Sequence, residues 1–323
     1  MTSKCKLDIM LYTESGWGKT TQIGNLAEWL FKETGKRTRL LSASGGGWAC
    51  IQSIVDAGII DPVAIGEQDY LMEKLIRAYT RGWWPEEPSD PSSILLPPPH
   101  FKDREAAKNW KHGYQSQDAW DSFGLWAFDG LGEMCAKLMT HLQEKAAGGM
   151  NVTADSKVAC TYTDGATKFG GRTQGMWGEI QGRAEQAVAN AKTAFPDRIV
   201  LWTTLVDKGE DDVTKKATYG PEIIGHAKTA SSVAWCENCF HGFHQEPSKG
   251  EASLKKQMWL KPHYDRFGIP YLAKIAVDGY YSEQAPDVLE GEDLTLKVGC
   301  STGLVKVMEL ISEAEAQAKE RLK

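Results

Sequence analysis

Residues 13–21 read TESGWGKTT, and this stretch decides the fold class. A short apolar run, LDIMLY at 7–12, precedes it and has the character of a buried parallel strand. After it, apolar residues recur at helical spacing: Ile23, Leu26, Ala27, Leu30 and Phe31. A glycine-containing turn between a buried strand and a helix is the context of a phosphate-binding loop. The sequence therefore predicts a nucleotide site at this turn, within an α/β domain.

The composition of this loop suits a triphosphate. Gly16 and Gly18 allow backbone amides to turn inward, and the start of the next helix adds positive partial charge. Lys19 is expected to reach the β- and γ-phosphates, and Thr20 to ligate Mg²⁺. Thr13 departs from the pattern G-x-x-x-x-G-K-[ST], which begins with glycine. The candidate nucleotide-binding residues are Thr13, Glu14, Ser15, Gly16, Trp17, Gly18, Lys19, Thr20 and Thr21.

A second motif lies at 125–129, where LWAFD ends a predicted strand in an aspartate. A carboxylate at the carboxyl edge of the sheet, beside the loop, is typical of a Walker B segment that holds Mg²⁺ through water. Asp129 is therefore the predicted metal partner of Thr20. Gly130 follows where many ATPases carry a glutamate, and Glu133, one helical turn on, is expected to be a poor substitute on geometry.

A third motif, IVLWTT, ends in Thr203 and Thr204. A polar group at the tip of a neighbouring strand can sense the γ-phosphate. Two threonines at a strand end can equally be satisfied by backbone groups. The sequence leaves both interpretations open.

The rest of the chain alternates strand and helix patterns, which predicts an α/β fold with a mostly parallel central sheet flanked by helices, plus a C-terminal helix. Further strands are expected at 38–43, 123–128, 198–206, 232–244 and 255–261, the last two suited to a hairpin. Helices are expected at 49–57, 68–79, 177–194 and 303–323, with another after Asp129 that carries Met134, Leu138 and Leu142 on one face. We expect a core over 1–284 with a Pro- and Trp-rich insertion at about 83–120, and a C-terminal extension over 285–323.

Composition excludes several classes of protein. The net charge of −6 argues against a protein built mainly to coat nucleic acid, although a local basic groove stays compatible with it. The longest apolar runs are far shorter than a membrane span, and the N-terminus has no cleavage-site pattern. Seven scattered cysteines favour a reducing compartment. We therefore expect a cytoplasmic protein.

Four stretches, in order, resemble the RecA-like P-loop ATPases carried by bacteriophages: TESGWGKTT, SASGGGWACIQSIVDAGII, GLWAFDGL and WGEIQGRAEQAVANAKTAFPDRIVLWTTLVDK. A fifth, YGPEIIGHAKTASSVAW, is similar to the family's Pro-x-x-x-Gly-x-x-Lys region on the γ-phosphate side, and together they span residues 7–280. The resemblance implies an ATPase that uses ATP and Mg²⁺, and some members act in recombination or single-strand annealing. Ser42 and Ser44 stand where the family places a catalytic glutamate, so the resemblance implies slow hydrolysis.

The resemblance also implies partners. Homo-oligomers are common in such ATPases, and a cation from a neighbour often stabilises the transferring phosphoryl group. Lys228 is the first candidate for that cation, since it follows Gly225 in the fifth stretch; Lys208, Arg172 and Arg183 are alternatives. Each of them, taken alone, fits an exposed surface base better. The catalytic candidates are Lys19, Asp129, Thr203, Thr204 and Lys228.

Single-stranded DNA is the expected macromolecular partner. The segment 161–176 holds four glycines and four threonines, and we expect a flexible loop that contacts DNA phosphates through Lys168 and Arg172. If the protein is encoded by a phage, we expect it to act in the cytoplasm of the host cell. Two other classes stay open: a packaging or helicase-type motor, and a protein that uses ATP binding to lock an assembly.

Two further features carry open alternatives. Trp17 is suited either to stacking on a base or to packing on the sheet. The run C-x2-C-x-H-x2-H, formed by Cys236, Cys239, His241 and His244, has zinc-ligand residue types, but its pairs lie too close for a classical zinc finger. Because this run reads as a strand, Cys236 and Cys239 are expected on opposite faces, which favours a structural role.

Overall fold

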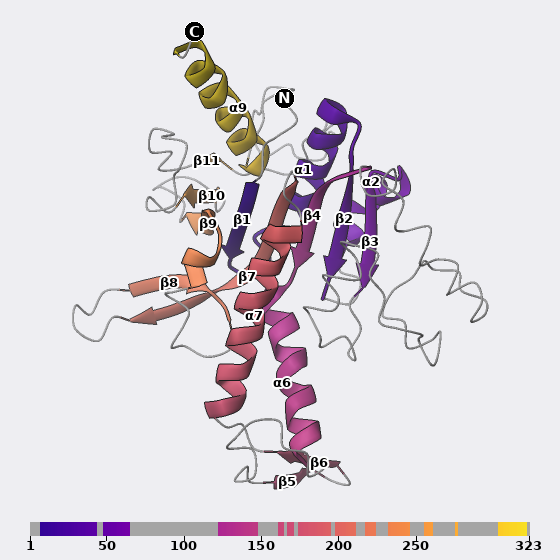
Figure 1. The fold of residues 1–323 in the computed structure, drawn as a ribbon, viewed down its shortest axis with the longest axis vertical. Coiled ribbons are helices and arrows are strands. Elements are labelled where there is room, and N and C mark those ends of the chain that lie inside the picture. The colour runs from indigo at the N-terminus through magenta and orange to yellow at the C-terminus, as the bar shows by residue number, and fades with distance from the viewer. Residues whose placement is uncertain are drawn as a thin grey trace.

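The computed structural model describes residues 7–43, 48–64, 122–147, 161–164, 167–170, 174–194, 198–210, 217–223, 232–245, 255–260, 275–276 and 303–321. Its centre is one large sheet (Figure 1). Adjacent parallel strands follow the order β3 (Ile60–Ala64), β2 (Arg37–Ser42), β4 (Phe123–Asp129), β7 (Ile199–Glu210), β1 (Leu7–Thr13) and β9 (Asn238–Gln245). This arrangement confirms the predicted α/β class with a mostly parallel sheet.

Antiparallel strands extend this parallel core. β10 (Lys255–Leu260) pairs with β9, which confirms the expected hairpin, and β11 (Ile275–Ala276) pairs with β10. β8 (Ala217–Pro221) pairs with the long final part of β7. The predicted strand ends at residue 206, whereas β7 continues to Glu210. Its final part extends past the end of β1 and forms a hairpin with β8.

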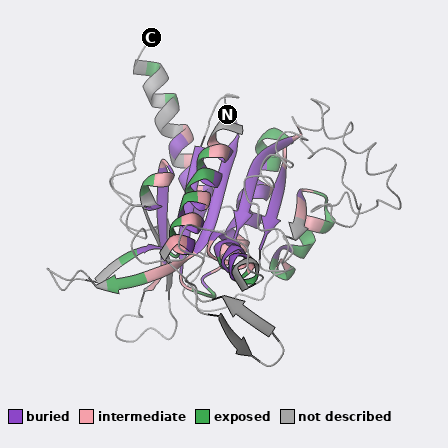
Figure 2. Ribbon diagram, turned by 60° about the horizontal axis from the view of Figure 1, so that its bottom comes forward, coloured by how far each residue is buried: buried purple, intermediate pink, exposed green. Residues whose placement is uncertain are grey.

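Helices cover both faces of the sheet. α1 (Lys19–Thr34) and α9 (Gly303–Arg321) share one apolar cluster with the strands, and the short elements η1 (Ala49–Ile51) and α2 (Gln52–Asp56) contribute to it. α6 (Leu131–Ala147) and α7 (Gln174–Ala194) share the other cluster. Figure 2 shows the strands buried between these layers. No helix in the described residues is long and apolar enough to cross a membrane.

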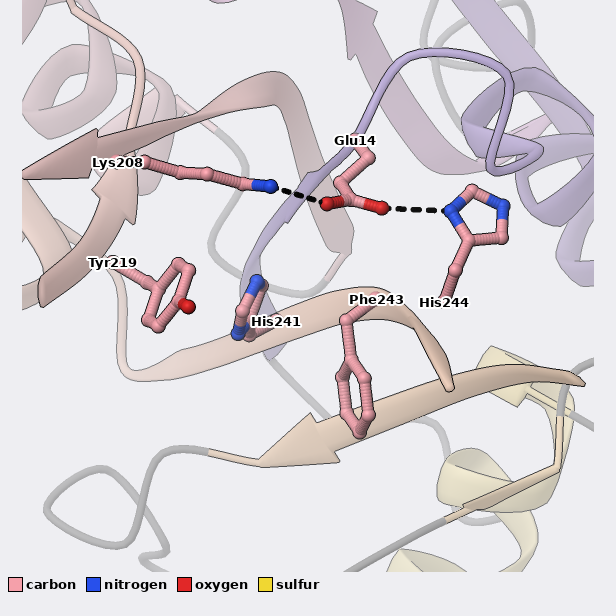
Figure 3. Close-up of a pocket in the computed structure, with 6 residues that line it drawn as sticks. All are labelled: Glu14, Lys208, Tyr219, His241, Phe243 and His244. Carbon is pink, nitrogen blue, oxygen red and sulfur yellow. Dashed lines mark hydrogen bonds and ion pairs between the residues drawn. The ribbon is translucent and has the colours of Figure 1, made fainter. Parts of the chain in front are cut away.

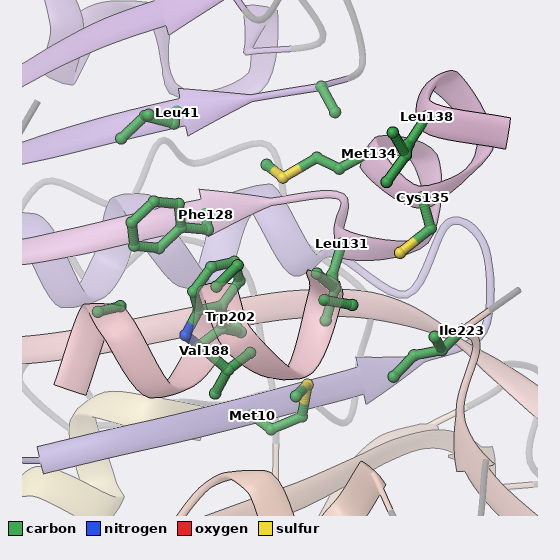
Figure 4. Close-up of a cluster of buried hydrophobic side chains, with 14 of the residues drawn as sticks. Met10, Leu41, Phe128, Leu131, Met134, Cys135, Leu138, Val188, Trp202 and Ile223 are labelled. Carbon is green, nitrogen blue, oxygen red and sulfur yellow. The ribbon is translucent and has the colours of Figure 1, made fainter. Parts of the chain in front are cut away.

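The strands are apolar because both of their faces are buried. In β1, Ile9 and Leu11 belong to the cluster with α1, whereas Met10 and Tyr12 belong to the cluster with α6 and α7. Each alternate side chain therefore meets a helix layer. Figure 4 shows the second cluster, in which Phe128 stacks on Trp202 with ring centroids 4.1 Å apart. These contacts fix β4 and β7 beside each other, so their polar ends meet at one edge.

The C-terminal helix is part of this core. Leu304, Val307 and Met308 are buried in the same cluster as α1. The backbone amide of Leu304 donates to Oε1 of Gln22, in the first turn of α1, at 3.0 Å. α9 is therefore attached one turn from the predicted phosphate-binding loop.

The prediction of a flexible loop over 161–176 is wrong. β5 (Thr161–Asp164) and β6 (Thr167–Gly170) pair antiparallel, and α7 already begins at Gln174. The residues Thr161, Tyr162, Thr163 and Phe169 have high strand propensity, which outweighs the local glycines. Figure 1 shows α6 and the start of α7 running past the tips of the parallel strands, with β5 and β6 at the far end.

Other expectations have mixed outcomes. α1 ends at Gly35, as predicted, because Gly35 adopts a left-handed φ of 69° and its amide caps the carbonyl of Phe31. Strand β3 was not expected, since its five residues IDPVA contain a proline and no alternation; this placement suits the outermost parallel strand of the described sheet. The expected helix at 68–79 and insertion at 83–120 lie outside the described residues.

Candidate functional site

The loop after β1 has the backbone shape that a phosphate cradle requires. Gly16 and Gly18 have φ of 73° and 109°, which side-chain-bearing residues rarely adopt. Gly18 caps α1, and its carbonyl accepts from the amide of Gln22 at 3.0 Å. The loop therefore leads directly into a helix N-terminus, whose free amides favour an anion.

Trp17 anchors this loop. Its side chain is fully buried, and Nε1 donates to the carbonyl of Phe243 on β9 at 3.1 Å. A Cβ added at Gly242 would lie 2.6 Å from the indole ring, so β9 needs glycine at this point. Of the two open interpretations, packing on the sheet is therefore the one observed.

The two predicted metal partners lie in contact. Thr20 Oγ1 donates to Oδ2 of Asp129 at 2.9 Å, and Thr203 Oγ1 donates to Oδ1 at 2.5 Å. The amide of Gly130 donates to Thr203 Oγ1 at 3.2 Å. This chain joins the start of α1 to the tips of β4 and β7. It brings together three residues that lie far apart in the sequence.

Lys19 lies in an acidic surrounding. Burial lowers the pKa of its ammonium group, and the negative charges of Asp129, Glu133 and Glu222 oppose that effect. A cation held partly out of water at the carboxyl edge is prepared for a polyanion. Glu222 is a functional candidate that the motifs did not single out, and Glu133 is one that the sequence indicated to be poorly placed.

Glu14 joins the loop to the neighbouring strands. Lys208 Nζ lies 2.6 Å from its Oε1, and His244 Nδ1 lies 2.7 Å from its Oε2 (Figure 3). The hydrogen bonds from Lys208 and His244 lower the pKa of Glu14 to about 2. Glu14 is therefore ionised at neutral pH and braces the loop between β7 and β9.

A pocket of about 240 Å³ lies against this brace. Its lining includes the aromatic rings of Tyr219, His241 and Phe243. His241 stacks on Tyr219 and, on the interior side, on the buried Tyr12, with ring centroids 5.2 Å and 4.9 Å apart. Figure 3 shows Phe243 beside His241 on the same strand. The lining residues come from the loop after β1 and from β7, β8 and β9, so no local motif could have predicted the pocket.

The remaining predicted residues lie as follows. Thr13 is fully buried, and its hydroxyl donates to the carbonyl of Glu14. Thr204 donates to the carbonyl of Glu222 at 2.8 Å. Arg183 pairs with Glu179 along α7 at 2.7 Å. Ser15 is exposed at the loop tip, and Thr21 continues α1. Lys228 and Arg172 lie outside the described residues, and Lys168 lies on β6.

The expectation that Cys236 and Cys239 occupy opposite faces is wrong. Both are buried in the cluster with α6 and α7. The reason is that β9 begins only at Asn238, after the short turn η5 (Val233–Trp235), so strand alternation does not relate the two cysteines. Among the described residues, no group of three or more His, Cys, Asp or Glu is arranged to hold a metal ion.

Comparison with known proteins identifies no relative by sequence. No family model matches the chain. No curated protein matches it either. Among solved structures, a KaiC-like protein from the hyperthermophilic archaeon Pyrococcus horikoshii OT3 is similar at a TM-score of 0.39 and 9% identity, over 84% of this chain and 85% of that one. This likeness is too distant to transfer any activity, so the functional assignment depends on the site geometry.

Proposed function

We propose that this protein is a RecA-like P-loop ATPase that binds Mg-ATP at residues 13–21. The observation that carries the proposal is the contact of Thr20 with Asp129, whose other oxygen accepts from Thr203. Lys19 follows the left-handed Gly18 and begins α1 at the same edge. The strong loop motif and the LWAFD motif, which is weak on its own, thus contribute hydroxyl, carboxylate and ammonium groups that lie together.

The residues present fit a magnesium ion. Mg²⁺ prefers oxygen ligands and retains several waters, and here a hydroxyl and a carboxylate lie 2.9 Å apart. Thr20 would hold the ion directly and Asp129 through water. When bound, Mg²⁺ neutralises charge that develops on the phosphates. Besides the metal ion, the ammonium group of Lys19 supplies a positive charge from the protein, and the amides of the helix N-terminus orient the phosphate oxygens.

Asp129→Asn tests this assignment. The amide is a poor partner for a hard cation, so the Mg²⁺ concentration needed for half-maximal ATP hydrolysis should rise about 10–100-fold. Titrating Mg²⁺ at fixed ATP measures the shift. Asp56→Asn, an exposed position on α2, is the matched control and should leave it unchanged. An unaltered Mg²⁺ dependence in Asp129→Asn would mean that Asp129 only ends a strand.

A role in phage DNA recombination or single-strand annealing is the finer part of the proposal. It is supported by the placement of Lys168 on β6, in a hairpin beyond the edge where the phosphate-binding loop lies (Figure 1). Two cations per subunit would bind DNA weakly. Useful affinity therefore requires several subunits along one strand, in a homo-oligomer.

Substituting Lys168 and Arg172 together by alanine tests the DNA contact. Each phosphate contact contributes about 0.7 to the slope of log affinity against log salt for a single strand, so the double variant should lose about 1.4 per subunit. Fluorescence anisotropy of a labelled oligonucleotide, with ATP and Mg²⁺, measures the slope. ATP binding should not change. Absence of single-strand affinity in the wild type at low salt would favour a nucleotide-locked assembly protein instead.

A further inference from the structure

The proposed ATPase activity also needs a group that accepts a proton from the attacking water. Asp129 is engaged, since both of its oxygens accept hydrogen bonds from threonine hydroxyls. Glu14 is paired on both oxygens as well, with Lys208 and His244. Two other carboxylates, those of Glu133 and Glu222, act on the charge of Lys19. One of these two carboxylates is therefore the candidate base.

Glu133 is brought to the site by the turn that follows Asp129. Gly130 has a φ of 99°, and α6 starts at the next residue. A Cβ built on Gly130 would lie 2.7 Å from Oε2 of Glu133 and 3.3 Å from the Cβ of Ala43. The carboxylate thus folds back over the tip of β4, beside the residue that follows β2. Glu133 therefore faces the carboxyl edge that holds Asp129.

One oxygen of Glu133 has no partner in the described part of the chain. Oε2 is buried there without a hydrogen bond. A carboxylate oxygen withdrawn from water without a donor is costly to the fold, so such groups in native proteins call for an explanation. A donor that arrives with the substrate provides one.

Glu222 differs in position. It follows β8 and is exposed, and Thr204 donates to its backbone carbonyl rather than to its carboxylate. A Cβ built on Gly132 would lie 3.9 Å from its Oε2, so it approaches the first turn of α6 from the side of β7. Although the residue is exposed at the surface, the partial withdrawal of its carboxylate from water, together with the charges of Glu133 and Asp207, raises the pKa of Glu222. Glu222 therefore reinforces the negative potential but is not the enclosed acceptor.

We propose that Glu133 is the general base of ATP hydrolysis in this protein. Its carboxylate accepts a proton from a water molecule while the water oxygen forms a bond to the γ-phosphorus. The bond from the γ-phosphorus to the β–γ bridging oxygen breaks, and ADP leaves with that electron pair. The products are ADP and inorganic phosphate. This inference rests on the proposed binding of ATP at residues 13–21.

Glu133→Gln is the test, because it keeps the size of the side chain and removes the acceptor. Single-turnover hydrolysis of ATP should slow by a factor on the order of 10²–10⁴. ATP affinity, measured with a fluorescent analogue, should be kept or improved, since a negative charge near the phosphates is lost. Glu133→Asp, which keeps a carboxylate, should keep partial activity. Glu144→Gln, exposed on the same helix, is the matched control.

Several results would overturn the inference without affecting the proposed binding. Turnover at the wild-type rate in Glu133→Gln would do so, even if that variant bound ATP more tightly. The charge of Glu133 would then affect only the electrostatic environment of Lys19. A large loss in Glu222→Gln with none in Glu133→Gln would move the role to Glu222. Absence of hydrolysis in the wild type with ATP bound would remove it altogether. By contrast, ATP binding that survives Lys19→Ala contradicts the binding site itself.

Discussion

Replacing Lys19 with alanine is expected to weaken ATP binding by about 2–5 kcal/mol, the usual cost of removing one partner of a buried hydrogen-bonded charge pair. The negative charges of three carboxylates act on this ammonium group: Asp129, Glu133 and Glu222. Without it, the triphosphate would meet only negative side chains on this side. The remaining attraction would come from the loop amides and the helix N-terminus. Isothermal titration calorimetry with Mg-ATP measures the loss.

Lys32→Ala is the matched control for this experiment. Lys32 lies on the same helix α1 and is partly exposed, where it pairs with Glu28 at 3.4 Å. Its removal changes the net charge equally but should leave ATP affinity within a factor of about two. Equal losses in the two variants would mean that Lys19 acts only through overall charge. Undiminished affinity in Lys19→Ala would place the nucleotide elsewhere.

Trp17→Ala is expected to lower the free energy of unfolding by about 3–5 kcal/mol, as for other large buried aromatic side chains. The indole packs on Gly242 and donates to the carbonyl of Phe243, so the variant loses both core volume and the link between the loop and β9. The Phe243 carbonyl also loses its donor. Urea unfolding followed by circular dichroism measures the change.

Phe31→Ala supplies the comparison, since Phe31 is 37% exposed on α1. Its effect should stay near 0.5 kcal/mol. If Trp17→Ala were equally mild, the indole would not be part of the core. Normal ATP binding by a Trp17→Ala protein that remains folded would also contradict the anchoring role of Trp17.

Much of the fold was predictable because buried strands and amphipathic helices leave strong local patterns. The apolar run before Thr13 and the one before Asp129 became β1 and β4. Prediction failed where local signals compete or where the first residue of a strand is not marked in the sequence. The glycines at 161–176 indicated a loop, yet β5 and β6 pair with each other. The predicted strand at 232–244 includes Cys236, whereas η5 occupies Val233–Trp235 and β9 begins only at Asn238.

The candidate site was predictable in its first half only. Lys19, Thr20 and Asp129 follow from motif spacing, and the parallel sheet brings them to one edge. From the sequence, Glu133 lies one helical turn past Asp129 and is expected to be a poor substitute on geometry. The left-handed turn at Gly130 returns its carboxylate to the edge, and no local pattern encodes that return. Glu222 and His244 reach the site through β8 and β9, whose pairing depends on the whole sheet.

Equilibrium binding of ATP to the wild-type chain, with and without Mg²⁺, tests the central claim most directly. The contact of Thr20 with Asp129 beside Lys19 predicts saturable binding of one ATP per chain, strengthened by Mg²⁺ and abolished by excess ADP as competitor. Calorimetry at constant ionic strength gives stoichiometry and affinity together. Absence of saturable ATP binding, or binding with the same affinity in Lys19→Ala, would contradict the assignment of residues 13–21 as a nucleotide site.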